Sequence, residues 1–182
     1  MEFEAFPKIP RLKRGCLITE KIDGTNAQIG ITPDGRVFAG SRSRWLQPGK
    51  STDNYGFAAW VEDNKEELLK LGHGRHFGEW WGKGIQRGYG LDHKRFSLFR
   101  ARPIEFLPSC VGVVPVLYAG DFSSTVVDEM VSMLAAEGSV AAPDFVDPEG
   151  VVVFLPAASH LYKVLCKGDS LPKTATNPQE PS

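Results

Sequence analysis

The chain has 182 residues, of which 42% are hydrophobic and 24% are charged, values typical of a single globular domain. Its 21 lysines and arginines against 22 aspartates and glutamates give a formal net charge of −1. This balance excludes the overall basic field of proteins that coat nucleic acid, so any polynucleotide contact must come from a local patch.

The first half of the chain predicts an irregular basic lead-in followed by a β-meander. Residues 1–15 contain two prolines and a cluster of lysines and arginines. Strands are predicted over 17–21, 26–31 and 36–39. A tight turn at Asp23-Gly24 separates the first two strands, because Asp-Gly is ordinary turn chemistry.

The second half predicts two helices and several short strands. Apolar spacing indicates helices over 54–71 and 123–137, each followed by a glycine that ends it. Short apolar strands are expected at 96–99, 113–118, 150–155 and 161–165. Residues 170–182 carry almost no core-forming side chains and are expected to form a disordered tail after one domain over 1–169. Together these elements predict an α+β fold with two mainly antiparallel β-sheets and flanking helices.

The N-terminus and the cysteines predict a cytoplasmic protein without membrane contact. Met1-Glu2-Phe3-Glu4 lacks the basic-then-apolar pattern of a secretion signal, and no apolar run approaches the roughly 18 residues of a membrane span. Cys16, Cys110 and Cys166 are far apart and lack Cys-x-x-Cys spacing. We therefore expect neither structural disulfides nor a cysteine-bound zinc ion.

Five motifs carry side chains suited to chemistry. The run Lys21-Ile22-Asp23-Gly24-Thr25-Asn26 places a lysine at the end of a strand, where its amine can serve as a nucleophile. The other motifs, in chain order, are Gly40-Ser41-Arg42-Ser43-Arg44, Phe77-Gly78-Glu79-Trp80, the strand from Phe96 to Phe99, and Pro148-Glu149-Gly150 with Tyr162-Lys163-Val164 after it. Each motif by itself is common, so their order along the chain is the informative feature.

This ordered set, over about residues 7–173, resembles the covalent nucleotidyltransferase superfamily of RNA ligases, DNA ligases and mRNA capping enzymes, and most closely its small RNA-ligase-like proteins. The resemblance implies a nucleotide groove between two antiparallel sheets and a requirement for ATP and Mg²⁺ or Mn²⁺. It also implies the reaction. A lysine attacks the α-phosphate of ATP, the lysyl-AMP passes its nucleotide to a 5′-phosphate end, and a 3′-hydroxyl then displaces AMP.

The resemblance assigns roles to individual residues. Lys21 is the expected nucleophile and Lys163 the catalytic lysine that contacts the α-phosphate, while Arg42 reaches the ribose or a phosphate. Both cations are also expected to help Lys21 lose its proton, because an ammonium group cannot attack. Glu79 is expected to accept hydrogen bonds from the ribose hydroxyls, and Phe99 to stack on the purine base.

Further residues complete the expected nucleotide site. Glu149 is expected to help hold the divalent ion, since Mg²⁺ prefers carboxylate and phosphate oxygens. Glu20 is expected to meet the base edge through its backbone or side chain, and Asn26 to contact the nucleotide. The larger ligases have a second lysine two positions after Lys163. Here Leu165 occupies that position, and Lys167 or Lys173 is the candidate replacement.

RNA contact is expected from local basic patches. The candidates are Lys8, Arg11, Lys13, Arg14, Arg75, Lys83, Arg87, Lys94 and Arg95. Trp81 or Tyr89 is the expected stacking partner for a base. Only a short tail follows Lys163, so a bare catalytic domain is expected, with a protein partner as one source of a polynucleotide clamp. Two alternatives remain open: a DNA nick ligase or capping-type guanylyltransferase, and a nucleotide- or RNA-binding module that does not ligate.

Overall fold

The computed structural model describes residues 2–9, 11–99 and 107–169, whose strands form two sheets. The four-stranded sheet has the order β10-β9-β1-β8, and the six-stranded sheet the order β4-β3-β2-β5-β6-β7. The strands are β1 Gly15–Lys21, β2 Thr25–Ile31, β3 Val37–Ser41, β4 Trp45–Leu46, β5 Gly74–Gly82, β6 Lys94–Leu98, β7 Val111–Val113, β8 Val116–Asp121, β9 Gly150–Leu155 and β10 His160–Leu165. Every strand pair in the described residues is antiparallel except β6–β7, which confirms the expected α+β fold with mainly antiparallel sheets.

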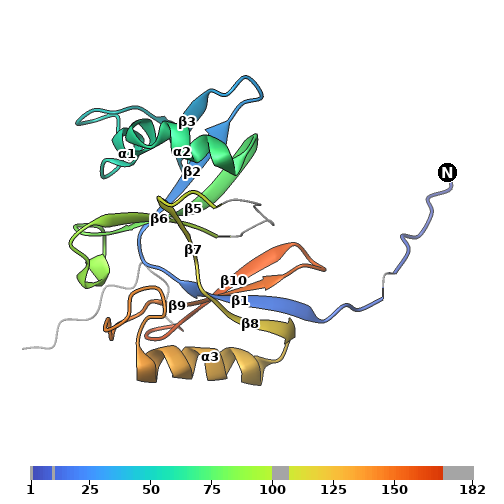
Figure 1. Cartoon of the computed structure of the whole chain (residues 1–182). Helices are drawn as coiled ribbons and strands as arrows, with labels where there is room; N and C mark the ends of the chain where they lie inside the picture. The colour runs from blue at the N-terminus through green and yellow to red at the C-terminus, as the bar shows by residue number, and fades with distance from the viewer. Residues whose placement is uncertain (1, 10, 100–106, 170–182) are drawn as a thin grey trace, which may run out of the picture.

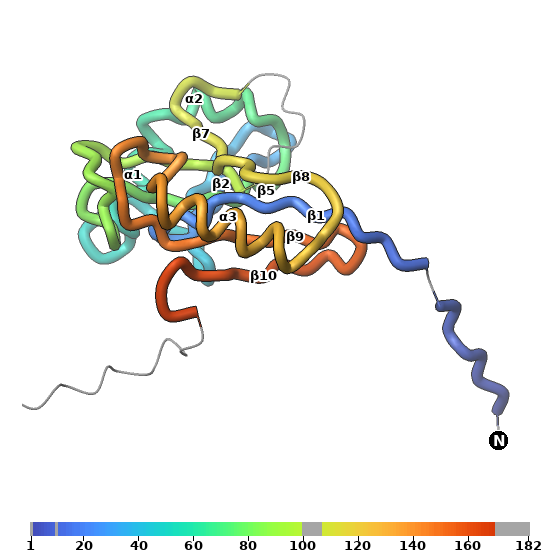
Figure 2. The backbone as a smooth tube through the Cα atoms, turned by 90° about the horizontal axis from the view of Figure 1, so that it is seen from below, coloured from blue at the N-terminus to red at the C-terminus, as the bar shows by residue number. Residues whose placement is uncertain are grey.

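Short helices cover one face of each sheet (Figure 1). The helical elements are α1 Phe57–Asp63, α2 Lys65–Leu68, the 3-10 turns η1 Leu69–Leu71 and η2 Gly88–Gly90, and α3 Ser124–Glu137. Figure 2, in which the molecule is seen from below, shows α3 lying across β1 and β9. None of these helices is both long and apolar enough to cross a membrane.

Alternation along β1 divides its side chains between a core and a groove. Cys16 and Ile18 are buried in one cluster with Val127 and Leu134 of α3. Because successive side chains of a strand point to opposite faces, Lys21 at the end of β1 lies on the other face, which is turned toward the six-stranded sheet.

The six-stranded sheet is built by the same rule. Ala27, Ile29 and Ile31 of β2 are buried with Phe57 and Leu68, which come from the helices. Full burial of an aliphatic or aromatic side chain of this size stabilises the fold by about 1.5–3 kcal/mol. Asn26, Gln28 and Gly30 of β2 lie on the opposite face, so each sheet has one face in a core and one face toward the site.

The predicted β-meander is wrong at its first turn. β1 and β2 belong to different sheets, so the Asp23-Gly24 connection crosses between the sheets and does not close a hairpin. Gly24 is required there because a β-carbon would lie 2.5 Å from the carbonyl oxygen of Trp80 and 2.8 Å from Cβ of Trp81. The predicted pairing of β2 with β3 is confirmed.

Two other predicted elements are divided. The strand expected over 113–118 is split at Pro115, with β7 in the six-stranded and β8 in the four-stranded sheet. The helix expected over 54–71 breaks at Asn64, whose φ of −109° lies outside the helical range. The helix expected over 123–137 is confirmed as α3, with Gly138 at its end at φ 90°.

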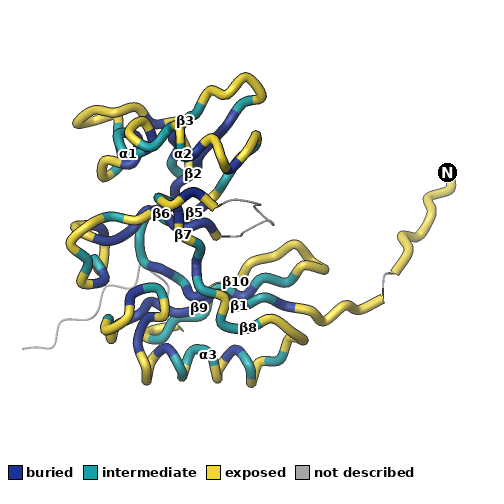
Figure 3. The backbone as a smooth tube through the Cα atoms, viewed as in Figure 1, coloured by how far each residue is buried: buried dark blue, intermediate teal, exposed yellow. Residues whose placement is uncertain are grey.

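Two predictions concern the ends of the chain, the basic lead-in and the disordered tail. Residues 2–9 and 11–14 are exposed and extend away from the sheets (Figure 3). The lead-in basic cluster therefore joins β1 at its far end, roughly 20 Å along the strand from Lys21. The disordered tail expected over 170–182 lies outside the described residues, as does Lys173.

Candidate active site

A groove between the two sheets contains two adjoining pockets. One has a volume of about 500 Å³ and the other about 470 Å³. Four side chains line both pockets and so mark their junction: Lys21, Asn26, Arg42 and Glu79. All four were predicted as site residues, and they come from β1, β2, the loop after β3, and β5.

The pocket of about 470 Å³ is apolar, and residues of the four-stranded sheet form most of its walls. Its walls include Leu17, Val114, Val152, Phe154, Leu161 and Tyr162. Phe99 and Lys163, both predicted site residues, line the same pocket. Phe99 is 37% exposed whereas Phe96 is fully buried, as expected for residues that lie on opposite faces of the chain. An aromatic ring beside an aliphatic wall suits a planar heterocycle.

The pocket of about 500 Å³ is polar. Its lining includes Thr25, Ser41, Ser43, Arg44, Asn54 and Gln86 in addition to the four shared side chains. Among these residues, hydroxyl groups, amides and two guanidinium groups can donate hydrogen bonds to an anion. An apolar pocket and an anion-binding pocket therefore meet at Lys21.

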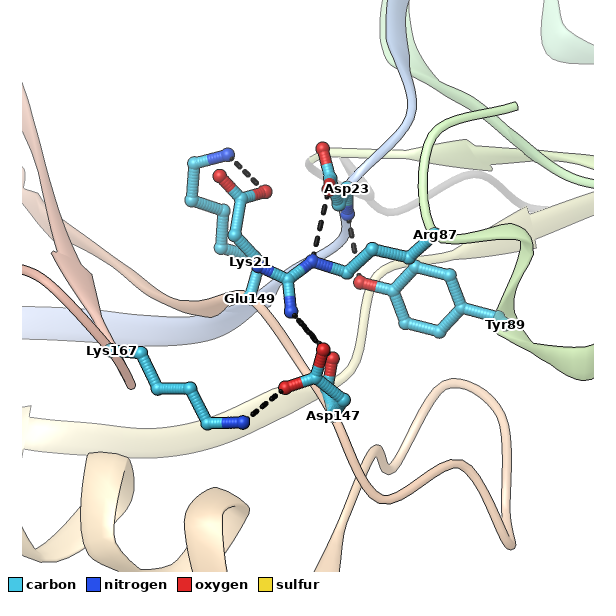
Figure 4. Close-up of polar contacts among 7 residues, drawn as sticks. All are labelled: Lys21, Asp23, Arg87, Tyr89, Asp147, Glu149 and Lys167. Carbon is cyan, nitrogen blue, oxygen red and sulfur yellow. Dashed lines mark hydrogen bonds and ion pairs between the residues drawn. The ribbon is translucent and has the colours of Figure 1, made fainter. Parts of the chain in front are cut away.

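Lys21 makes one close polar contact. Its Nζ donates to Oε2 of Glu149 at 2.6 Å, across 128 residues of sequence (Figure 4). The two are held together because Lys21 pairs with Gly150 in the β1–β9 register. Glu149 is buried, with 7% of its side chain exposed. A buried carboxylate requires a cation, and Lys21 supplies it.

Glu79 lies beside this pair as a second buried carboxyl group. Burial, the largest cause, and the negative charges of Glu149 and Asp23 together raise the pKa of Glu79 to about 7, although Lys21 opposes the rise. The Gly24 amide donates a hydrogen bond to Glu79 and also opposes it. Two carboxyl groups, Glu79 and Glu149, thus lie close to the Lys21 amine.

Two neighbouring carboxyl groups suit a divalent cation. In the described residues, no three His, Cys, Asp or Glu side chains gather as a metal site. An ion at Glu149 would therefore take most of its ligands from phosphates and water, which is the usual coordination of Mg²⁺ beside a nucleotide. Its charge would offset the repulsion from Glu149 and Asp23, which adds to the effect of burial on the pKa of Glu79.

Sequence reasoning missed a network of ion pairs behind the junction (Figure 4). The Arg87 guanidinium donates to Oδ2 of Asp23 at 3.0 Å, and to both Oδ2 and the carbonyl oxygen of Asp147 at 2.8 and 2.9 Å. Asp23 lies two residues after Lys21, and Asp147 two residues before Glu149. Arg87 thus ties together the chain segments that carry the pair. The signal in the sequence was the shared spacing of the two aspartates from the two site residues.

Lys167 belongs to this network and does not line either pocket. Its Nζ donates to Oδ1 of Asp147 at 2.7 Å, and 80% of its side chain is exposed. Glu20 is also directed away from the groove. Its carboxylate accepts hydrogen bonds from the Ser139 hydroxyl and, at 2.8 Å, from the Ala141 amide. The backbone amide of Glu20 donates to the carbonyl oxygen of Pro115 at 3.0 Å, so neither its amide nor its side chain is free to meet a base.

The expected stacking partners for RNA are wrong. Trp81 and Tyr89 are each 2% exposed. The Trp81 indole donates to the Ser97 hydroxyl, and the Tyr89 hydroxyl accepts a hydrogen bond from the Asp23 amide. Burial is the largest cause that raises the pKa of Tyr89 well above its usual range, and the hydrogen bond from the Asp23 amide opposes this rise. Both rings support the Asp23-Gly24 crossover and are not available to a base.

Comparisons with known proteins identify the family and the fold of the chain. The family described as RNA ligase matches residues 15–164. A structure of Naegleria gruberi RNA ligase with PPi is 21% identical with a TM-score of 0.62, and a mutant of that ligase with ATP and Mn is 20% identical with a TM-score of 0.63. The matches cover 84% and 85% of this chain but 49% and 50% of the ligase chains, so the chain spans about half their length. No curated protein sequence matches the chain significantly. Because the family match extends over most of its length, the chain belongs to the RNA ligase family.

Proposed function

We propose that this chain is the nucleotidyltransferase domain of an ATP-dependent RNA ligase and that Lys21 becomes covalently adenylylated. The observation that carries the proposal is the position of Lys21, at the junction of an apolar pocket and a polar pocket. A nucleotide has the same division, with a planar base at one end and phosphates at the other. Bound across the junction, ATP would present its α-phosphate to Nζ.

The base lies in the apolar pocket, where Phe99 stacks on one face of the purine. Glu79 accepts a hydrogen bond from a ribose hydroxyl. A carboxyl group with a pKa of about 7 can do so after losing its proton, and the loss is favoured when a cation or hydroxyl approaches. Arg42, which lines both pockets, contacts the ribose or a phosphate.

The transfer to Lys21 exchanges one bond for another. Nζ forms a bond to the α-phosphorus, the bond to the β-phosphate oxygen breaks, and pyrophosphate leaves. Nζ must first lose a proton, and Oε2 of Glu149 at 2.6 Å is the acceptor within reach. Lys163, which lines the same apolar pocket, offsets the charge on the α-phosphate. Mg²⁺ or Mn²⁺ held by Glu149 would offset charge on the same phosphate and on the departing pyrophosphate.

Two further transfers complete the proposed reaction. A 5′-phosphate oxygen attacks the α-phosphorus of lysyl-AMP and releases the lysine amine. A 3′-hydroxyl then attacks the activated 5′-phosphorus and releases AMP. RNA ends are the proposed substrate, supported by the family match, and a cytoplasmic location is supported by three free thiols. A protein partner or a further segment is the proposed source of a polynucleotide clamp, since this chain spans about half of the ligases that it matches.

The test is the intact mass of the protein after incubation with ATP and Mg²⁺. We expect the added mass of AMP on Lys21 by peptide mapping, and its loss in Lys21→Ala. Lys83→Ala is the matched control, because that lysine is exposed and lines neither pocket. AMP on another lysine, or no adduct in the wild type, would contradict the proposal. A preference for GTP would instead indicate capping chemistry.

A further inference from the structure

Beyond the nucleotide groove, the inner face of the six-stranded sheet carries exposed side chains, among them Phe77 and Arg75. Strand alternation puts Asn26, Gln28 and Gly30 of β2 on this face. Their partners on β5 are Glu79, Phe77 and Arg75 in the antiparallel register. The face therefore begins at the two nucleotide-site residues and ends, roughly 13 Å farther along β2, at Gly30 and Arg75.

Trp45 of β4 lies on this face of the sheet in an unusual environment. Its side chain is 50% exposed, whereas Trp80 and Trp81 are 2% exposed. The indole lies over two glycines. A β-carbon on Gly30 would come within 2.9 Å of its Cη2 atom, and one on Gly40 within 3.1 Å of its Cε3 atom. The sheet thus omits two side chains to seat the indole, yet leaves half of the indole surface in water.

A second aromatic ring and two guanidinium groups accompany the indole. Phe38 is 39% exposed, with its ring centroid 5.7 Å from that of Trp45. The cavity beside them has a volume of about 720 Å³ and is lined also by Arg44, His73 and Arg75. No aspartate or glutamate is among its lining residues. Exposed aromatic rings among arginines without carboxylates fit a ligand that carries both flat apolar groups and negative charge.

The surface is continuous with the active site. Arg44 and Leu46 line both the aromatic cavity and the polar pocket that contains Lys21. A polymer that lies on Trp45 can therefore place its end beside Lys21 without leaving the protein surface. The cavity is lined by arginines without carboxylates, which suits the phosphates of a polynucleotide better than a protein surface of mixed charge.

We infer that the surface formed by Phe38, Arg44, Trp45 and Arg75 binds single-stranded RNA next to the reacting end. This inference rests on the proposed ligase function. Bases stack on the Trp45 and Phe38 rings, and the Arg44 and Arg75 guanidinium groups pair with phosphates. The surface replaces the buried Trp81 and Tyr89 as the stacking site, and it lies on the same chain as the nucleophile.

The test measures binding of a fluorescein-labelled, 12-nucleotide single-stranded RNA by anisotropy over a salt series. Loss of one stacking side chain weakens binding by about 5- to 100-fold, so we expect that range for Trp45→Ala and retention of most affinity in Trp45→Phe. Phe122→Ala is the matched control, because Phe122 is 47% exposed and lies outside this surface. Arg75→Ala should reduce the slope of log affinity against log salt by about 1. It also tests the surface if Trp45→Ala does not fold.

Self-adenylylation separates this inference from the proposed function. Trp45 lines neither pocket at Lys21, so Trp45→Ala should accept AMP from ATP as the wild type does. A wild type that binds RNA through Trp45 but never forms lysyl-AMP would refute only the ligase proposal. RNA affinity that is equal in the wild type, Trp45→Ala and Arg75→Ala would overturn the inference. A surface that binds no RNA, but whose Trp45→Ala variant changes self-association in gel filtration, would be a protein contact and would also overturn it.

Discussion

Replacing Glu79 by glutamine should stabilise the protein at alkaline pH and leave its stability unchanged in acid. Burial raises the pKa of Glu79 from 4.5 to about 7. The unfolded chain keeps the lower value, so between these two pH values the folded state binds a proton that the unfolded state has lost. Stability from this group is therefore complete below pH 4.5, falls as the pH rises to 7, and is constant above about pH 8.

The expected size of the effect follows from the shift. A rise from 4.5 to about 7 corresponds to about 3 kcal/mol of unfolding free energy, lost by the wild type across this range. Glutamine has a similar volume and does not titrate. We therefore expect Glu79→Gln and the wild type to unfold alike at pH 4.5, and the variant to gain up to about 3 kcal/mol at pH 8.5.

Urea unfolding at a series of pH values measures this difference, with the fluorescence of buried Trp80 and Trp81 as the probe. Other titrating groups cancel when the variant is compared with the wild type at each pH. Glu62→Gln is the control, since 63% of that side chain is exposed. A Glu79→Gln difference that does not change with pH would refute the reasoning. The same variant should bind ATP more weakly. It lacks the carboxylate that we propose binds the ribose, although that carboxylate destabilises the fold.

Three other changes follow from the contacts around Lys21. Gly24→Ala should destabilise the fold by about 1–3 kcal/mol in urea unfolding, because its β-carbon would meet the backbone of Trp80, whereas Gly15→Ala should be neutral within about 0.5 kcal/mol since nothing lies within 4 Å. In a double-mutant cycle, Arg87→Ala and Asp147→Ala should show a coupling free energy of unfolding of about 0.5–1 kcal/mol at low salt. Additive effects would show that the Arg87–Asp147 ion pair does not stabilise the contact between the two segments. Glu149→Gln should fold, but form lysyl-AMP more slowly and with an altered Mg²⁺ dependence; wild-type kinetics at every Mg²⁺ concentration would show that this carboxylate has no part in transfer.

Local patterns in the sequence determined much of the site. Alternation along a strand puts Phe99 and Phe96 on opposite faces, because that periodicity is a property of the backbone. Apolar spacing followed by a glycine likewise predicted α3 and its end at Gly138. The order of the motifs indicated that Lys21 and Glu79 would share a site, and both line the same two pockets.

Contacts between distant segments were decided only by the tertiary structure. Asp23-Gly24 has the composition of a hairpin turn, but close packing against Trp80 makes it a crossover between sheets. Lys167 and Glu20 have the right charge and sequence position for the nucleotide, yet nearer partners hold both side chains elsewhere. Turn chemistry and side-chain period are set by a few neighbouring residues. Which strands pair, and which charges meet in the groove, depends on how two sheets pack across more than a hundred residues.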